Sequence, residues 1–84
     1  MKKKILILGS TGSIGKSSLN IVRNYKSKLK IIALSTNKNV ELIIKQSNEF
    51  KVKNLIINDF ESYKKILNYG LDKKIKIFNN ISDF

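Results

Sequence analysis

The sequence predicts an α/β domain in which strands and helices alternate around a parallel sheet. Three observations lead to this prediction. Short apolar runs that suit buried strands alternate with segments whose apolar residues recur at helical spacing. The resulting order, β-α-β-α-β-α-β, favours parallel strands joined by right-handed crossovers. A glycine-rich turn, "ILGSTGSIGKSS" from Ile7 to Ser18, joins the first strand to the first helix.

Four segments have the pattern of strands. The first, "KKILIL" from Lys3 to Leu8, contains an apolar run without alternation, which is typical of a central strand covered on both faces. Residues 29–35 and 54–57 have the same character, whereas residues 74–78 alternate and predict a more exposed strand. The final residues, "NNISDF", indicate a turn and the start of another helix.

Two helices are expected between the first three strands. The first runs from about Ser13 to Tyr25. Its apolar face is expected to contain Ile14, Ser18, Ile21 or Val22, and Tyr25. Asn39 is placed to cap the second helix. The inner face of that helix is expected to consist of Val40, Ile43, Ile44, Ser47 and Phe50.

A third helix is expected before the fourth strand. Asn58 and Glu61 have the N-cap and N3 spacing of a capping box. The helix would bury Tyr63, Ile66 and Leu67. Gly70 is expected to end it in a left-handed conformation.

Composition narrows the classes of function. A chain of 84 residues allows one small domain. It contains no apolar stretch near the ~20 residues of a membrane helix, and the start "MKKKILIL" lacks the features of a signal peptide. The expected location is therefore the cytosol, away from membranes. The absence of cysteine and histidine excludes disulfides, thiolate nucleophiles and imidazole bases.

The net charge of +11 would suit a nucleic-acid-binding module. The alternative is compositional, because isoleucine (14), lysine (16) and asparagine (10) fill 40 of the 84 positions, as expected from a genome rich in A and T. The lysines are spread along the chain, and aromatic residues do not interleave with them as in a stacking platform. We therefore favour solvated lysine faces over a nucleic-acid partner.

The glycine turn has the composition of a phosphate-binding loop. A mononucleotide P-loop, G-x-x-x-x-G-K-[ST], would need glycine at position 10, where Ser10 stands. The spacing Gly9-x-x-Gly12-x-x-Gly15 is instead a variant of the dinucleotide fingerprint, and it follows a strand and opens a helix as that fingerprint requires. We favour the dinucleotide interpretation, and a tight turn without a ligand is the alternative.

Each glycine has a steric role in this interpretation. Gly9 lets the chain turn sharply off the strand, Gly12 lets the backbone approach the pyrophosphate, and Gly15 lets the helix pack close to the sheet. The pyrophosphate would lie on the amides at the helix N-terminus. Thr11 and Ser13 add hydroxyl donors.

The turn after the second strand bears on the choice of cofactor. An NAD enzyme tends to place an acid there to hold the ribose 2′-hydroxyl. Here "ALSTNKN" has no acid and instead provides Ser35, Thr36, Asn37, Lys38 and Asn39. These residues suit a 2′-phosphate, and we favour NADP. The alternative for Lys38 is one more surface lysine.

"ILGSTGSIG", followed some twenty residues later by "ALSxxKNV", resembles the N-terminus of the 1-deoxy-D-xylulose 5-phosphate reductoisomerase family. The later stretch "NVELIIKQSNEFKVKNLIIND" follows the same pattern, so the resemblance covers the whole chain. It implies a partial Rossmann-like, doubly wound parallel sheet. Residues 1–84 would form the N-terminal part of an NADPH-binding domain, and the catalytic and C-terminal domains would be absent from this chain.

The resemblance also implies which residues bind NADPH. The family's loop corresponds to Thr11, Gly12, Ser13 and Ile14, and its second turn to Lys38 and Asn39. With the motif, the expected cofactor-binding set is Gly9, Ser10, Thr11, Gly12, Ser13, Ile14, Gly15, Ser35, Asn37, Lys38 and Asn39. The family commonly has glycine where Asn37 stands, and Asn tolerates a left-handed backbone better than other non-glycine residues.

The family converts 1-deoxy-D-xylulose 5-phosphate to 2-C-methyl-D-erythritol 4-phosphate in the non-mevalonate isoprenoid pathway. The resemblance thus implies NADPH, a sugar-phosphate substrate and a homodimeric full-length enzyme. The divalent metal, Mg²⁺ or Mn²⁺, is expected only in the missing catalytic domain, and this chain alone is expected to be inactive. Two alternatives are another NAD(P) reductase, such as a semialdehyde dehydrogenase or an epimerase-like protein, and a basic nucleic-acid-binding module.

Overall fold

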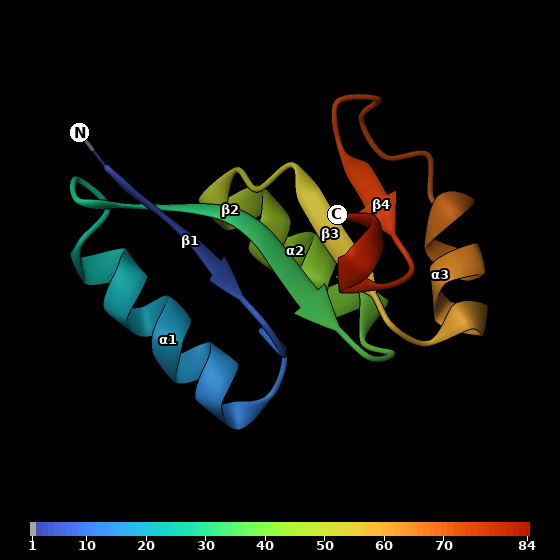
Figure 1. Cartoon of the computed structure of the whole chain (residues 1–84), viewed down its shortest axis with the longest axis horizontal. Coiled ribbons are helices and arrows are strands. Elements are labelled where there is room, and N and C mark those ends of the chain that lie inside the picture. Colours follow the sequence, from blue (N-terminus) through green and yellow to red (C-terminus); the bar gives the residue numbers. More distant parts are fainter. Residues whose placement is uncertain (1) are drawn as a thin grey trace.

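Strands and helices alternate in the predicted order in a computed structural model of the chain, which describes residues 2–84 (Figure 1). The elements are β1 (Lys3–Ile7), α1 (Ser13–Asn24), β2 (Leu29–Thr36), α2 (Val40–Phe50), β3 (Asn54–Ile57), α3 (Phe60–Leu67), β4 (Lys76–Phe78) and the 3₁₀ helix η1 (Ile81–Asp83). The predicted α/β fold with a parallel sheet is confirmed. No helix within residues 2–84 is long and apolar enough to cross a membrane.

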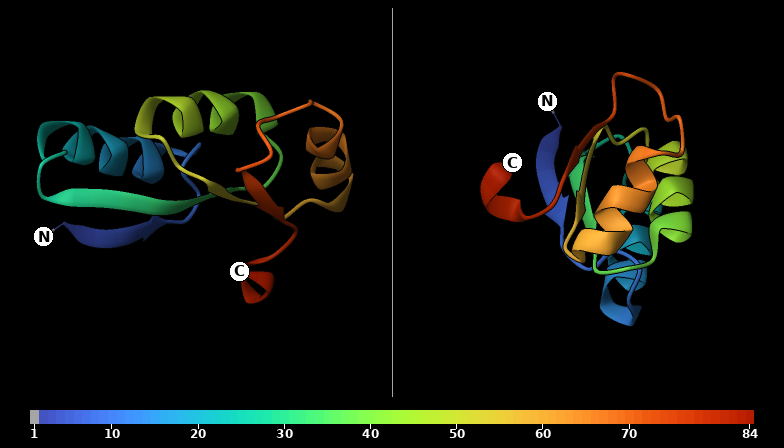
Figure 2. Two further views of the ribbon diagram at one scale, coloured as in Figure 1. Left: turned by 90° about the horizontal axis from the view of Figure 1, so that it is seen from above. Right: turned by 90° about the vertical axis from the view of Figure 1, so that its right-hand side faces the viewer.

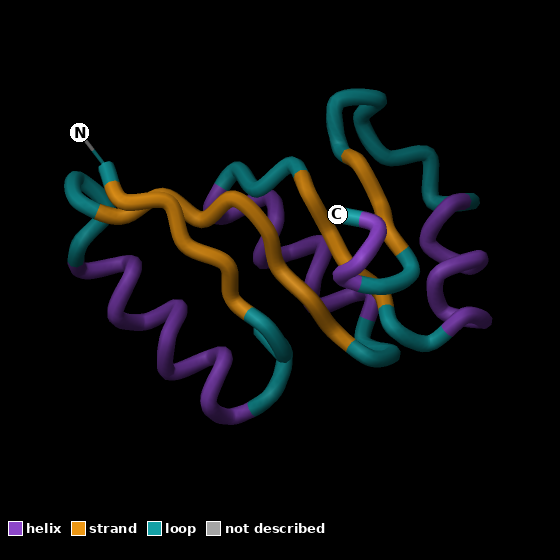
Figure 3. Tube along the Cα trace, viewed as in Figure 1, coloured by secondary structure: helices purple, strands orange, loops and turns teal. Residues whose placement is uncertain are grey.

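The four strands form one parallel sheet in the order β1-β2-β3-β4. The tube in Figure 3 shows them side by side, with the helices in the crossovers. Between β1 and β2 the register shifts, since Ile5 pairs with Ile31 but Leu6 pairs with Ala33. Because the strands are parallel, the turns that follow β1, β2 and β3 all lie along the same edge of the sheet.

All three helices cover one face of the sheet, and the C-terminal turn lies on the other side (Figure 2). The main core lies between the helices and the sheet, where Leu19, Leu34, Ile43 and Leu55 are almost completely buried. On the other side, the Phe84 ring packs edge-on against Phe78 with centroids 5.6 Å apart. We expected β1 to be a central strand, but among the described residues it pairs only with β2 at the sheet edge.

The buried face of α1 differs from the predicted one. Gly15, Leu19 and Val22 are buried, whereas Ile14, Ile21 and Tyr25 are exposed. Of the apolar residues proposed for this face, only Val22 is buried. The contact of Gly15 with the turn after β1 sets the rotation of the helix, because this glycine must face the sheet.

The second and third helices follow the predicted pattern more closely. The Asn39 side chain caps α2 by accepting a hydrogen bond from the Leu42 amide at 3.2 Å, as predicted. The N-cap of α3 is Asp59 and not Asn58, because the Asp59 carboxylate accepts the hydrogen bond of the Ser62 amide. Gly70 has the predicted positive φ, +67°, while Leu67, expected inside, is exposed.

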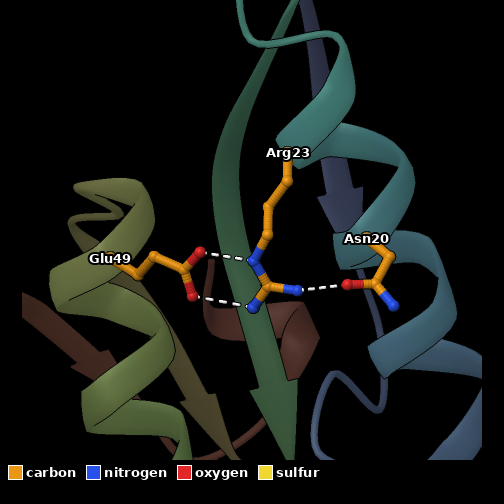
Figure 4. A network of polar contacts seen from close by, with 3 residues as sticks. All are labelled: Asn20, Arg23 and Glu49. Carbon is orange, nitrogen blue, oxygen red and sulfur yellow. Dashed lines mark hydrogen bonds and ion pairs between the residues drawn. The ribbon is translucent and has the colours of Figure 1, made fainter.

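A polar contact joins α1 to α2 on the surface (Figure 4). The Arg23 guanidinium donates two hydrogen bonds to the Glu49 carboxylate and one to the Asn20 side chain. The hydrogen bond from Arg23 lowers the pKa of the Glu49 carboxyl. Both side chains are exposed, so the pair contributes only modestly to stability.

Candidate functional site

The residues singled out in the sequence meet along the carboxyl edge of the sheet. The glycine turn follows β1, the Asn37–Asn39 turn follows β2, and Asp59 follows β3. Backbone hydrogen bonds join the glycine turn to the end of β2, from the Ser10 amide to the Ser35 carbonyl at 2.8 Å, and join Asp59 to the turn after β2, from the Asp59 amide to the Asn37 carbonyl at 3.1 Å. The structure therefore brings together the two loops that the sequence assigned to one ligand.

The glycine turn is tight, and its glycines have different roles. Gly9 has φ +64°, a left-handed conformation that glycine adopts without steric cost. A Cβ on Gly15 would lie 2.1 Å from the Gly9 carbonyl oxygen and 2.5 Å from the Ser10 Cα, which no packed structure allows. A Cβ on Gly12 would meet only the Gly9 oxygen, at 3.5 Å. Gly15 is thus required by the protein's own packing, and Gly12 is not.

The end of β2 anchors the glycine turn. The Ser35 hydroxyl accepts a hydrogen bond from the Gly9 amide at 2.8 Å, and the hydroxyls of Thr11 and Thr36 share one at 2.6 Å. Ser35 is buried, as is Ser10 in the turn itself. These two side chains, which the sequence placed in the binding set, support the loop from inside the protein.

Gln46 on α2 is a buried polar residue at this site that the sequence pattern did not single out. This side chain is 5% exposed and forms two hydrogen bonds with one residue of the turn. Its Nε2 donates to the Ser10 carbonyl at 2.9 Å, and its Oε1 accepts from the Ser10 hydroxyl at 2.7 Å. The only signal in the sequence is a polar residue within the apolar spacing of a helix.

The N-terminus of α1 has no cap of its own. Gly12 is the N-cap residue, no side chain bonds the first turn, and the first turn contains no acid. Within residues 2–84, no acceptor is found for the amides of Thr11, Ser13, Ile14 and Gly15. Amide donors and the positive end of the helix dipole together favour an anion at this position.

The turn after β2 is open to solvent. Asn37, Lys38 and Asn39 are all exposed, and the Lys38 carbonyl accepts a hydrogen bond from the Val40 amide at 2.8 Å. Asn37 does not need the left-handed conformation that its glycine counterpart would allow, because Lys51 is the only non-glycine residue with positive φ in residues 2–84. The turn therefore presents the Lys38 side chain in an ordinary backbone geometry.

Asp59 adds one acid near this edge. Its carboxylate accepts hydrogen bonds from the hydroxyl and the amide of Ser62, at 2.8 and 3.0 Å. These bonds, with a smaller contribution from the positive charge of Lys38, lower the pKa of the Asp59 carboxyl. The Asp59 carboxylate therefore stabilises the N-terminus of α3. The described part of the chain contains no group of three or more carboxylate, histidine or cysteine residues that could hold a metal ion.

Taken together, the parallel sheet, the alternating strands and helices and the glycine turn define an α/β domain of the Rossmann type. The profile of the family "1-deoxy-D-xylulose 5-phosphate reductoisomerase" matches residues 5–82. The chain belongs to this family, as its sequence resemblance predicted.

Individual relatives agree with this assignment. The chain is 45% identical over 78 residues to the 1-deoxy-D-xylulose 5-phosphate reductoisomerase of Pelagibacter ubique, and 43% identical over 75 residues to that of Caldanaerobacter subterraneus subsp. tengcongensis. These alignments cover 93% and 89% of this chain but 20% and 19% of the relatives. The chain therefore spans about a fifth of the length of the curated relatives it matches.

Solved structures show the same fold. The Zymomonas mobilis reductoisomerase, solved in complex with NADPH, superimposes with a TM-score of 0.83 at 24% identity, covering 93% of this chain and 21% of the other. A DOX-P reductoisomerase solved in complex with magnesium gives a TM-score of 0.77 at 29% identity, covering 93% and 20%. Neither the nucleic-acid interpretation nor a different class of reductase is favoured by these relatives.

Proposed function

We propose that this chain is the NADPH-binding portion of a 1-deoxy-D-xylulose 5-phosphate reductoisomerase. The observation that carries the proposal is the uncapped N-terminus of α1, which leaves backbone donors free at the end of β1. Family membership supports it, and a relative with the same fold was solved with NADPH. The domain assignment of residues 1–84 is part of the same proposal.

The pyrophosphate is assigned to the glycine turn. The amides of Thr11, Ser13, Ile14 and Gly15 donate to its oxygens, and the Thr11 and Ser13 hydroxyls add donors. Gly12 is assigned to keep the approach open, since a Cβ there would meet only the Gly9 carbonyl oxygen, at 3.5 Å, and the protein's own packing does not require a glycine. Gly9, Ser10 and Ser35 shape the turn.

The 2′-phosphate is assigned to the turn after β2. Lys38 supplies a positive charge, and the amide groups of Asn37 and Asn39 supply polar atoms on the same exposed turn. No acid occupies this turn, where an NAD enzyme tends to hold the ribose 2′-hydroxyl. The nearby acid, Asp59, is held by Ser62, so its carboxylate accepts protein hydrogen bonds.

This chain positions the cofactor and performs no bond-making step in the proposal. NADPH supplies hydride for the reduction when it is bound. The divalent metal, Mg²⁺ or Mn²⁺, is assigned to the catalytic part of the enzyme, since residues 2–84 offer no suitable cluster of ligands. Conversion of the sugar phosphate, a homodimeric assembly and a cytosolic location are proposed for the whole enzyme. The chain alone is expected to give no turnover.

Calorimetry with the purified chain tests the proposal. The parent is expected to bind NADPH, and Gly12→Val is expected to bind it more than about tenfold more weakly, because the side chain blocks the pyrophosphate. Circular dichroism and thermal unfolding of both proteins show whether the fold is intact. Unchanged affinity in a folded Gly12→Val variant would refute the dinucleotide site.

A second assay tests whether this chain alone catalyses the reaction. The purified chain is mixed with 1-deoxy-D-xylulose 5-phosphate, NADPH and Mg²⁺ or Mn²⁺, and loss of NADPH absorbance is followed. No turnover above a control without protein is expected. Turnover that disappears in Gly12→Val would show that the chain itself contains the catalytic machinery.

A further inference from the structure

The Gln46 side chain reaches from α2 into the glycine turn after β1. The two residues that it joins, Gln46 and Ser10, are 36 positions apart in the sequence. Gln46 both donates to the Ser10 carbonyl and accepts from the Ser10 hydroxyl, and both residues are buried. A carboxamide carries a donor and an acceptor side by side without a charge.

The two hydrogen bonds between Gln46 and Ser10 constrain the glycine turn on its buried side. The Ser10 amide is already held by the Ser35 carbonyl and the Gly9 amide by the Ser35 hydroxyl. Gln46 holds the remaining two polar groups of Ser10, so every polar atom of this residue has a partner inside the protein. The neighbouring amide of Thr11 and the first amides of α1 remain free for a ligand.

We propose that Gln46 is a positioning residue for pyrophosphate binding, acting through Ser10. It touches no ligand itself. It holds the turn in the conformation in which the amides of Thr11 and Ser13–Gly15 converge, so binding does not require them to be ordered first. This inference rests on the proposed function, because it specifies how the same site is held ready for its ligand.

The alternative is that Gln46 serves only the stability of α2. The next residue, Ser47, provides a matched control, since it is equally buried and its hydroxyl donates to the Val52 carbonyl at 2.8 Å. That bond joins the last turns of α2 to the segment that follows its C-cap. Loss of either side chain removes buried hydrogen bonding from the same helix, but only Gln46 contacts the turn.

The experiment compares two ligands on three proteins: the parent, Gln46→Met and Ser47→Ala. NADPH contains the pyrophosphate, whereas 2′-AMP contains the 2′-phosphate without a pyrophosphate. Gln46→Met is expected to weaken NADPH binding about tenfold and to change the affinity for 2′-AMP less than about twofold. Ser47→Ala is expected to lower the unfolding midpoint. Its affinities for both ligands, measured at a temperature where the variant is folded, should stay within about twofold of those of the parent.

Three outcomes overturn the inference. Equal NADPH affinity in Gln46→Met and the parent would show that the turn does not need Gln46. An equal loss of affinity for both ligands would show that Gln46 serves only the stability of the fold. A parent chain that binds neither ligand would refute the proposed function itself, whereas the first two outcomes leave that function standing.

A measurement on the parent covers the case in which Gln46→Met does not fold. Gln46 is the only glutamine of the chain, so selective ¹⁵N-glutamine labelling isolates its side-chain amide signals. Saturating NADPH is expected to shift these signals and slow their hydrogen exchange, and 2′-AMP is expected to leave them in place. Signals that do not respond to NADPH would overturn the inference without any substitution.

Discussion

The N-termini of α1 and α3 both lie at the carboxyl edge of the sheet, yet they are completed in opposite ways. Asp59 caps α3 through the Ser62 amide, and Glu61 places a second acid in the first turn. Gly12 provides no side chain at the start of α1, and the first turn contains no acid. The Asp59 side chain satisfies one first-turn donor of α3, whereas no side chain does so in α1.

Under the proposed function, the difference marks the place where the chain gives up local stability for binding. A capping side chain stabilises a helix by about 1 kcal/mol, and acids near the N-terminus interact favourably with the helix dipole. The second helix follows the rule, with Asn39 as its cap and Glu41 in its first turn. Only α1 departs from it, and it does so at the turn where the three glycines are clustered.

The largest effect is expected from Gly15→Ala. The new Cβ would collide with the backbone of Gly9 and Ser10, so α1 must move away from β1. We expect a loss of about 3 kcal/mol or more in the free energy of unfolding, measured by urea denaturation. Gly12→Ala is the matched control, because its Cβ has only an ordinary contact at 3.5 Å. Equal stability of Gly15→Ala and the parent would contradict the close contact between helix and turn.

Lys38→Ala should narrow the preference for NADPH over NADH. A charged hydrogen bond to the 2′-phosphate contributes about 1.5–3 kcal/mol, which corresponds to about tenfold to over a hundredfold in affinity. Calorimetry with both cofactors measures the ratio, and Lys45→Ala, on the exposed side of α2, controls for the loss of one positive charge. If Lys38→Ala discriminates as well as the parent, Lys38 is only a surface charge.

Gly12→Asp would convert α1 into a helix like α3. The backbone at this position is extended, with φ −85°, and has room for a side chain. We expect the free energy of unfolding to rise by about 0.5–1 kcal/mol, because the new carboxylate caps the free amides. NADPH binding should be lost at the same time. A variant that is stabilised and still binds NADPH would show that the first amides of α1 do not take part in NADPH binding.

The smallest effect concerns the acid dependence of α3. The pKa of Asp59 is lowered in the folded state, so its contribution to stability is present above its unfolded pKa of about 4 and is lost as the pH falls through the folded pKa. Asp59→Asn keeps a side-chain oxygen at the cap and removes this titration. Its unfolding midpoint should therefore fall less steeply than that of the parent between about pH 5 and pH 2.

A part of the acid dependence should remain in Asp59→Asn. The pKa of Glu49 is also lowered, by its hydrogen bonds to Arg23, and this contribution has the same sign. Identical pH profiles for the variant and the parent would show that the Asp59 carboxylate does not carry a folding-linked charge.

Local features of the site were predictable because each depends on neighbours in the sequence. The order of strands and helices follows from apolar runs, and the positive φ of Gly9 follows from the sharp turn off β1. Asn39 was identified as a cap because a cap bonds only three residues ahead. The same reasoning chose Asn58 over Asp59, since the sequence pattern alone does not fix the start of a helix to one residue.

Features that depend on distant contacts were not predictable. The sequence predicts the close packing of Gly15 but not its effect on the rotation of α1, which outweighs the apolar spacing of Ile14, Ile21 and Tyr25. Gln46 was missed because its partner, Ser10, is 36 residues away and adjacent only in the folded chain. The binding residues themselves stay a prediction until a ligand is measured on this chain.

Amide chemical shifts during a titration with NADPH test the contrast between the two helices most directly. With the ¹⁵N-labelled chain, the account predicts the largest changes at Thr11 and Ser13–Gly15, further changes at Lys38 and Asn39, and little change at the first amides of α3, Phe60 to Ser62. The α3 amides provide an internal reference at the same edge of the sheet. Changes at α3 as large as those at α1, or no change at α1 at saturating NADPH, would contradict the assignment of the uncapped helix to the pyrophosphate.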